Sequence, residues 1–234
     1  SPVAAEFKKE NVKGITAKVI KAAILGGDLY PSTAIGINLP NSNWVRAEHG
    51  SKSVTIANLT HAYAESSNGN GMLDEFVYSQ AEADLIRQYG GVTDDLHTDL
   101  HECLGHGSGK LLPGVDSEAL KAYGSTIEEA RADLFALYYL ADPKLVELGL
   151  LPNNEAYKAN YIGQMQNGLL TQIVRVKLGE EIEEAHMRNR ALIAYWAYAN
   201  GKGKAENGKD VIEMVKREGK TYICINEYTA LRNL

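Results

Sequence analysis

The chain has 234 residues with a hydrophobic content of 44%, and its 30 acidic and 24 basic side chains give a net charge of −6. This length and composition predict a globular protein with one large domain or two small ones. The acidic balance argues against a nucleic-acid partner, and no apolar run reaches the roughly 18–20 residues of a membrane span. The 2 cysteines are too few for a disulfide framework, which favours a cytoplasmic protein.

The first quarter of the chain is predicted to change from helix to strand. Apolar side chains recur at helical spacing over residues 5–25, which predicts an amphipathic helix, and Gly26-Gly27-Asp28 ends it. Residues 35–39 alternate in polarity and residues 53–57 are β-prone, so both segments are predicted to be strands.

Helical signals dominate from residue 72 onward. A helix over residues 72–89 is predicted to break at Gly90-Gly91, and the next helix opens at Asp94-Asp95 and ends at Gly107-Ser108-Gly109. Further helices are predicted from Ser125 to about residue 140, from Pro152 to about residue 178, over residues 180–200 and over residues 226–234. The expected fold is mainly α, with a helical lobe of residues 1–28 and 68–234, a strand-bearing segment of residues 29–67, and β structure near residues 33–58.

The most informative motif is His101-Glu102-Cys103-Leu104-Gly105-His106. Zinc peptidases commonly carry two His ligands four residues apart on a helix, with a Glu base directly after the first. Here the Glu is in place, but the second His follows after five residues, and a regular helix would turn the two imidazoles apart by roughly 140°. We predict a π-type or otherwise irregular turn between His101 and His106, where Gly105 can accommodate the distortion.

An ordinary helical pair is also present, because His97 and His101 are four residues apart. In that frame Thr98 follows the first His, so the position of the base lacks a carboxylate. The frame that starts at His101 supplies two ligands and a base together, and it is preferred.

A second motif, Glu128-Glu129-Ala130-Arg131-Ala132-Asp133, follows at the head of a predicted helix. A Glu on a following helix is a known third ligand for a zinc site with two His residues. Glu129 and Asp133 share a helix face, so one can bind the metal while the other holds a ligand imidazole in its tautomer. The alternative is that Glu128 and Glu129 simply favour the positive end of a helix.

Together, the two motifs resemble those of the dipeptidyl peptidase III family of zinc exopeptidases. Three further segments are similar to that family and occur in family order: Gly36-Ile37-Asn38-Leu39-Pro40-Asn41, Gly107-Ser108-Gly109-Lys110 and Ala185-His186-Met187-Arg188-Asn189-Arg190. The resemblance runs from about residue 30 to residue 190. It implies a zinc metallopeptidase with a helical zinc-binding lobe and a substrate-binding strand, which removes dipeptides from the N-terminus of short peptides.

The resemblance also implies a role for each matching residue. It makes His101, His106 and Glu129 the ligands of one Zn²⁺ per chain and Glu102 the catalytic base. The second motif itself makes Glu128 and Asp133 the candidate partners of the ligand imidazoles. The resemblance places Gly36, Asn38, Asn41 and Arg190 among the substrate-binding residues and His186 near the developing oxyanion as a second catalytic residue. Without the resemblance, the two Asn residues would be turn residues and His186 a solvated side chain on a charged helix.

The chain is much shorter than members of the family. They have a longer N-terminal region, with a Tyr that helps to stabilise the transition state, and a C-terminal region, with an Arg that binds the substrate carboxylate. We therefore expect two kinds of partner, an oligopeptide substrate and the remaining N- and C-terminal parts of a parent chain. The chain alone is expected to bind zinc but to cleave dipeptides poorly. Two alternatives stay open: a non-catalytic zinc-binding fragment, and a zinc hydrolase of another class.

Overall fold

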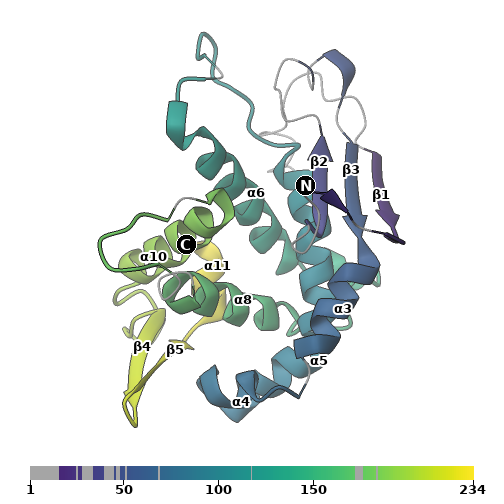
Figure 1. The fold of residues 1–234 in the computed structure, drawn as a ribbon. Coiled ribbons are helices and arrows are strands. Elements are labelled where there is room, and N and C mark those ends of the chain that lie inside the picture. The colour runs from purple at the N-terminus through teal and green to yellow at the C-terminus, as the bar shows by residue number, and fades with distance from the viewer. Residues whose placement is uncertain are drawn as a thin grey trace. The chain divides into compact units, whose positions relative to one another are not determined.

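The computed structural model has a mainly helical fold with two small sheets in its described part, which confirms the predicted fold class (Figure 1). It describes residues 16–24, 26–27, 34–39, 45, 48–50, 52–67, 69–116, 118–171, 176–182 and 184–234. The chain forms two compact units: the first comprises Ser1–Asn68 and Asp95–Ala136, and the second comprises Gly69–Asp94 and Leu137–Leu234. Helices α5 (Gln80–Leu100) and α6 (Gly124–Leu140) each contribute residues to both units.

The first unit contains a three-stranded sheet with β3 (Lys52–Ile56) in its centre. β1 (Thr16–Ile20) pairs with β3 in parallel, and β2 (Gly36–Leu39) pairs with β3 antiparallel. Helix α3 (Ala57–Ser67) continues directly from β3. The predicted strands at residues 35–39 and 53–57 therefore correspond to β2 and β3, within a residue at each end.

Hydrogen bonds connect the sheet of the first unit to the end of α5 and to the π turn η2 (His101–Gly105) that follows it. The Thr55 hydroxyl donates to Asp99 Oδ1 over 3.1 Å. The Ser53 hydroxyl donates to the backbone carbonyl of Glu102 over 3.4 Å. The strands thus fix the position of the turn that carries the first motif. A short 3₁₀ turn, η3 (Lys121–Tyr123), then leads into α6.

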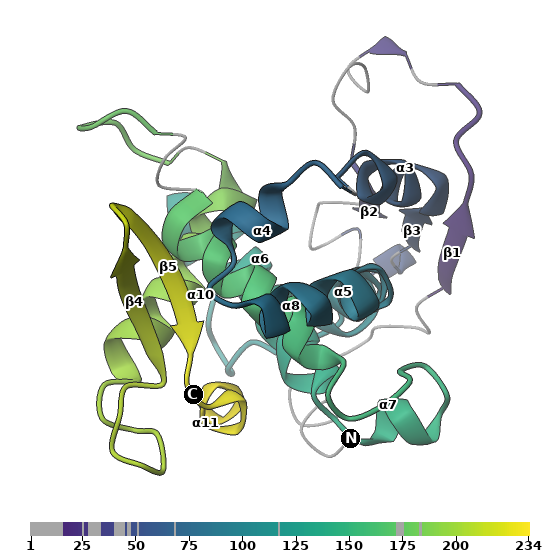
Figure 2. The same cartoon turned by 90° about the horizontal axis from the view of Figure 1, so that it is seen from below.

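The second unit is built from short helices and a β-hairpin. Its elements besides α5 and α6 are α4 (Met72–Phe76), α7 (Lys144–Glu147), α8 (Tyr157–Gln166), η4 (Asn167–Thr171), α10 (Ala185–Asn200), β4 (Ile212–Arg217), β5 (Lys220–Ile225) and α11 (Tyr228–Asn233). In the hairpin, β4 contacts α10 and β5 contacts α8 (Figure 2). The buried core of the second unit includes Val77, Ala83, Leu137, Ile162, Leu169, Ala194, Val211, Ile212 and Ile225.

The predicted helix over residues 5–25 is wrong where the chain is described, because Thr16–Ile20 forms strand β1. Thr16, Val19 and Ile20 are β-branched, so they fit a strand at least as well as a helix. Val19 and Ile20 are 66% and 43% exposed, so their spacing does not mark a buried helix face.

The predicted break at Gly90-Gly91 is also wrong, because α5 runs without interruption. Neither glycine has a positive φ, so each costs only the roughly 1 kcal/mol by which Gly is less favourable than Ala in a helix. Burial of Ala83, Thr93 and His97 on the same helix offsets that cost. The helix predicted from Pro152 to about residue 178 is shorter, because α8 gives way to a π turn at η4.

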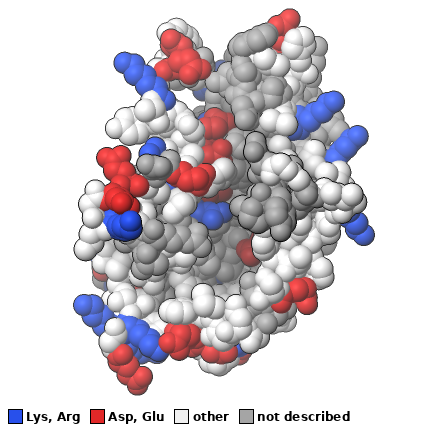
Figure 3. All heavy atoms as spheres, in the orientation of Figure 1, with Lys and Arg blue, Asp and Glu red and all other residues white. Residues whose placement is uncertain are grey.

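Charged side chains are dispersed over the one face of the molecule that Figure 3 draws. On the face drawn in Figure 3, Lys and Arg side chains occur singly or in small groups among acidic and uncharged ones. No helix in the described part of the chain combines the length and the apolar composition of a membrane span.

Candidate metal centre

The chain adopts π-helical geometry at the first motif, over His101–Gly105. The backbone N–H of His106 donates to the carbonyl of His101, five residues back, over 3.0 Å. As a result, the two imidazole rings approach each other, and their centroids are 4.8 Å apart. The irregular turn that the five-residue spacing predicts is confirmed.

The close approach of α6 to this turn depends on Gly105. A Cβ atom added there would lie 2.4 Å from Cα of Ala132 and 2.7 Å from its Cβ, well inside the roughly 3.5–4.0 Å of normal carbon contact. The two backbones can therefore pack together only because residue 105 has no side chain. Glu129 lies one turn before Ala132 on α6, so this packing brings its carboxylate to the two imidazoles.

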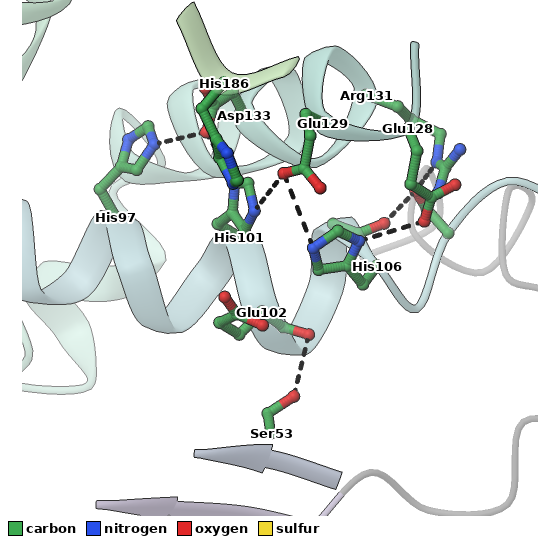
Figure 4. Close-up of polar contacts among 12 residues, drawn as sticks. Ser53, His97, His101, Glu102, His106, Glu128, Glu129, Arg131, Asp133 and His186 are labelled. Carbon is green, nitrogen blue, oxygen red and sulfur yellow. Dashed lines mark hydrogen bonds and ion pairs between the residues drawn. The ribbon is translucent and has the colours of Figure 1, made fainter. Parts of the chain in front are cut away.

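Three candidate ligands converge at this point (Figure 4). Glu129 Oε2 lies 3.2 Å from Nε2 of His101 and 3.9 Å from Nε2 of His106. Ligand atoms of the three residues all lie within 4.8 Å of one another. Atoms bound at about 2.0–2.1 Å to a tetrahedral zinc ion are about 3.3–3.4 Å apart. Two imidazoles and one carboxylate at these separations fit a zinc ion with one open position.

Both imidazoles are oriented by carboxylates on their other nitrogen atom. Nδ1 of His101 lies 2.6 Å from Asp133 Oδ1, and Nδ1 of His106 lies 3.1 Å from Glu128 Oε1. An ionised carboxylate only accepts hydrogen bonds, so each Nδ1 carries the proton. In the neutral imidazoles, Nε2 is then the atom whose lone pair can bind a metal.

The contacts of His101 favour an ion pair at neutral pH. Burial alone would lower the pKa of its imidazole, but hydrogen bonds to Asp133 and Glu129 raise the pKa to about 10. Burial would raise the pKa of Asp133, yet hydrogen bonds from His101 and His97 hold it well below its usual range. A metal ion that binds Nε2 of His101 must therefore displace a proton.

Glu128, which contacts the imidazole of His106, is itself held by contacts that the sequence motifs do not reveal. Arg131 pairs with Glu128 Oε2 over 2.6 Å, and its Nε donates to the Ser108 hydroxyl over 2.8 Å. Gly109 has a φ of +91°, and a Cβ there would lie 2.6 Å from Cζ of Arg131. The segment Gly107-Ser108-Gly109 thus leaves room for the guanidinium of Arg131. It also ends the helix, as predicted. A signal for this arrangement is the spacing of Arg131, three residues after Glu128 on one helix face.

Glu102, the predicted base, is 8% exposed. Figure 4 shows it on the side of the turn that faces the strands, opposite α6. A Cβ added to Gly36 would lie 2.9 Å from Glu102 Oε1, so strand β2 passes directly beside this carboxylate. Cys103, the next residue, is half-buried, and burial raises the pKa of its thiol, which agrees with a packing role.

The alternative His pair also meets a carboxylate. His97 and His101 form a second group with Asp133 whose ligand atoms lie within 4.8 Å of one another. Nε2 of His97 lies 3.1 Å from the same Asp133 oxygen that contacts His101.

The remaining predicted site residues are on β2, on α10 or outside the described residues. Asn38 is in β2, where its backbone is paired opposite Ser53, and Asn41 lies outside the described residues. His186 is on the first turn of α10, and its Nδ1 lies 2.7 Å from Glu184 Oε1. Arg190 follows one turn later. His186 and Arg190 belong to the second unit, and their roles stay predictions.

A π turn with two converging imidazoles, a neighbouring Glu and a carboxylate from the next helix is a donor set of the kind found in zinc hydrolases. Residues 30–121 match the model of peptidase family M49. The resemblance to the dipeptidyl peptidase III family is thereby confirmed for the part of the chain that carries the first motif and β2.

Individual relatives support the same relationship. The mouse protein named dipeptidyl peptidase 3 is 27% identical over 202 residues, which cover 72% of this chain and 27% of that protein. An Arabidopsis thaliana protein named Nudix hydrolase 3 is 26% identical over 212 residues, which cover 86% of this chain and 25% of that protein. The chain thus spans about a quarter of the length of these relatives.

The fold also matches a solved structure. Dipeptidyl peptidase III from Caldithrix abyssi superposes with a TM-score of 0.66 at 22% sequence identity, over 97% of this chain and 41% of that one. At this identity, the match is informative for the fold alone.

Proposed function

We propose that this chain supplies the zinc site of a metallopeptidase that removes dipeptides from the N-terminus of oligopeptides. The observation that carries the proposal is the convergence of His101, His106 and Glu129 at a π turn that also holds Glu102. Two oriented imidazoles and a carboxylate are a typical ligand set for a catalytic zinc ion. The relatives named dipeptidyl peptidase 3 support the choice of a peptide substrate.

Each residue of the proposed site has its own role in the reaction. When bound, zinc supplies a Lewis acid and lowers the pKa of water towards neutrality. Glu102 is the proposed base, which would take the proton of the attacking water and pass it to the leaving amine. Asp133 and Glu128 hold the two imidazoles in the tautomer that binds metal.

Strand β2 is the proposed binding strand for the peptide. It lies at an edge of the sheet, with β3 on one side, and an extended peptide can add to such an edge through main-chain hydrogen bonds. Gly36 brings this strand next to Glu102, so a peptide along β2 would pass near the base. Asn38 and Asn41 are proposed to bind the peptide, and His186 and Arg190 to assist at the oxyanion and the substrate.

The metal-binding part of the proposal is tested on this chain. Wild-type protein should bind one zinc ion per chain, measured by atomic absorption after dialysis. Glu129→Ala should abolish stoichiometric binding, because it removes one of three protein ligands. The matched control is Glu155→Ala, an exposed acidic side chain of the second unit, which should leave zinc content unchanged. Unchanged zinc content in Glu129→Ala would show that the site is misassigned.

The catalytic part needs the rest of the cleft, because the chain spans about a quarter of its relatives. We compare turnover of a dipeptidyl-arylamide by this chain and by a full-length relative, both saturated with zinc. Loss of a single oxyanion donor costs about 10²–10³ in rate, so the chain should be at least that much slower. Substitution of Gln for the Glu that corresponds to Glu102 should leave zinc bound in the relative and abolish turnover. Full activity of that variant would exclude this Glu as the base.

A further inference from the structure

Asp133 makes a three-residue arrangement that the two motifs alone do not indicate. Its Oδ1 atom lies 2.6 Å from Nδ1 of His101 and 3.1 Å from Nε2 of His97. Asp133 and both His residues are at most 7% exposed. A single carboxylate oxygen therefore contacts two buried imidazoles from the same helical segment.

The chemistry of the contact fixes the protons. The carboxylate of Asp133 is ionised and only accepts hydrogen bonds, so Nε2 of His97 and Nδ1 of His101 both donate. Two donors on one oxygen restrict rotation of the carboxylate more than one donor would. The orientation of His101, and with it the direction of its Nε2 lone pair, depends on where that oxygen is held.

The helix geometry explains why His97 is suited to this task. Residues four apart lie on one face of a helix, and the rings of His97 and His101 stack with centroids 6.5 Å apart and planes inclined by 30°. The π turn starts at His101, so His97 stays in regular helix while His106 is turned towards His101. The four-residue spacing thus places His97 beside His101 as its support, and the five-residue spacing places His106 as the second ligand.

We propose that His97 is a positioning residue of the metal centre, which acts through Asp133 to orient ligand His101. The proposal rests on the proposed function, because it takes His101, His106 and Glu129 as the zinc ligands. Of the pair His97 and His101, only His101 is then a zinc ligand, and His97 supports it. Outer partners of metal-bound His residues typically change metal affinity by about 10–100-fold when they are lost.

The test uses two substitutions of equal length. His97→Gln keeps an amide N–H that can donate to Asp133, whereas His97→Met has nearly the same shape without a donor. Zinc affinity is measured by competition with a chromophoric chelator, and the ligand field by the visible absorption of the Co²⁺-loaded protein. We expect His97→Met to weaken zinc binding by up to about 10-fold, the lower end of the loss for a group bonded directly to a ligand His, and to shift the cobalt bands. His97→Gln should retain most of the affinity and the wild-type bands.

A buried control on the same helix is Thr93→Val. Thr93 is fully buried one turn before His97, and its hydroxyl donates to the backbone carbonyls of Tyr89 and Gly90. This variant perturbs α5 without touching Asp133, so it should bind zinc and cobalt as the wild type does.

Each outcome decides the proposal. Wild-type affinity and bands in His97→Met would overturn it, and so would equal losses in His97→Gln and His97→Met, because the imidazole itself would then be required. Loss of affinity in Thr93→Val would show a general effect of α5 and would also overturn it. If wild-type protein binds no zinc, or if Glu129→Ala binds it normally, the proposed ligand set fails as well, which separates that failure from a failure of His97 alone.

Discussion

The sharpest structural prediction concerns Gly105→Ala. The added Cβ would lie 2.4 Å from Cα of Ala132, and relief to a normal carbon contact of about 3.5–4.0 Å requires a separation of roughly 1–1.5 Å between the π turn and α6. Zinc–ligand distances tolerate deviations of only about 0.2 Å. Glu129 would therefore leave bonding range of the imidazoles, and zinc affinity should fall by at least about 100-fold. Overpacking of this kind also costs about 1–3 kcal/mol of stability.

The assay is zinc titration in the presence of a competing chelator, with thermal unfolding of the metal-free protein measured in parallel. Gly91→Ala is the matched control, because Gly91 is also helical and an added Cβ there meets nothing within 4 Å. That variant should bind zinc normally and gain up to about 1 kcal/mol of stability. Wild-type zinc affinity in Gly105→Ala would refute the argument that direct packing of α6 on the turn places Glu129.

Further predictions concern other close contacts and one buried carboxyl. Gly109→Ala should weaken zinc binding about 10-fold, measured by chelator competition, because a Cβ there would displace Arg131. Gly36→Val should leave the zinc content of this chain unchanged. The same substitution at the corresponding Gly of a full-length relative should lower peptide turnover, because the new side chain would crowd the carboxylate that corresponds to Glu102. Burial raises the pKa of Glu82 above its ordinary value of 4.5, although hydrogen bonds from Ser79 oppose the shift. Its contribution to stability is therefore complete below about pH 4.5 and is lost as the pH rises through the folded-state pKa. Glu82→Gln should flatten this pH dependence of the free energy of unfolding, measured in urea. Relative to wild type, the variant should gain more stability at pH 7 than at pH 4. An unchanged pH profile would contradict a raised pKa for Glu82.

The π turn could be predicted from sequence because it follows from a counting argument. His101 and His106 cannot share a face of a regular helix, so a metal site that uses both requires a distortion. The pairing of Asp133 and Glu128 with the two imidazoles was also predictable as a class, since ligand His residues need such partners. Which carboxylate serves which imidazole depends on the packing of α6 against Gly105, and the sequence does not encode that contact locally.

The role of His97 was not predictable for the same reason. Its hydrogen bond to Asp133, the carboxylate that also contacts ligand His101, joins α5 to α6, and this contact forms only once these helices have packed together. Arg131 differs, because it pairs with Glu128 on its own helix. The motif places His97 at ordinary ligand spacing, so sequence alone offers it as a competing ligand. The structure shows a shared carboxylate oxygen there.

The β-hairpin of the second unit was missed although the sequence contains a signal for it. Residues 212–217 and 220–225 are separated by Glu218-Gly219, whose φ values are +48° and +77°. Two residues with positive φ form the tight turn that suits a two-residue hairpin. Strand β1 is a different case: its apolar spacing fits a helix, and only the parallel pairing with β3 decides for a strand.

The central claim is that His101, His106 and Glu129 hold one zinc ion. The most direct test is anomalous diffraction at the zinc absorption edge from crystals of the zinc-loaded protein. The account predicts a single strong peak within about 2.0–2.2 Å of Nε2 of His101, Nε2 of His106 and a carboxylate oxygen of Glu129. A peak among His97, His101 and Asp133, or no peak at the π turn, would contradict it.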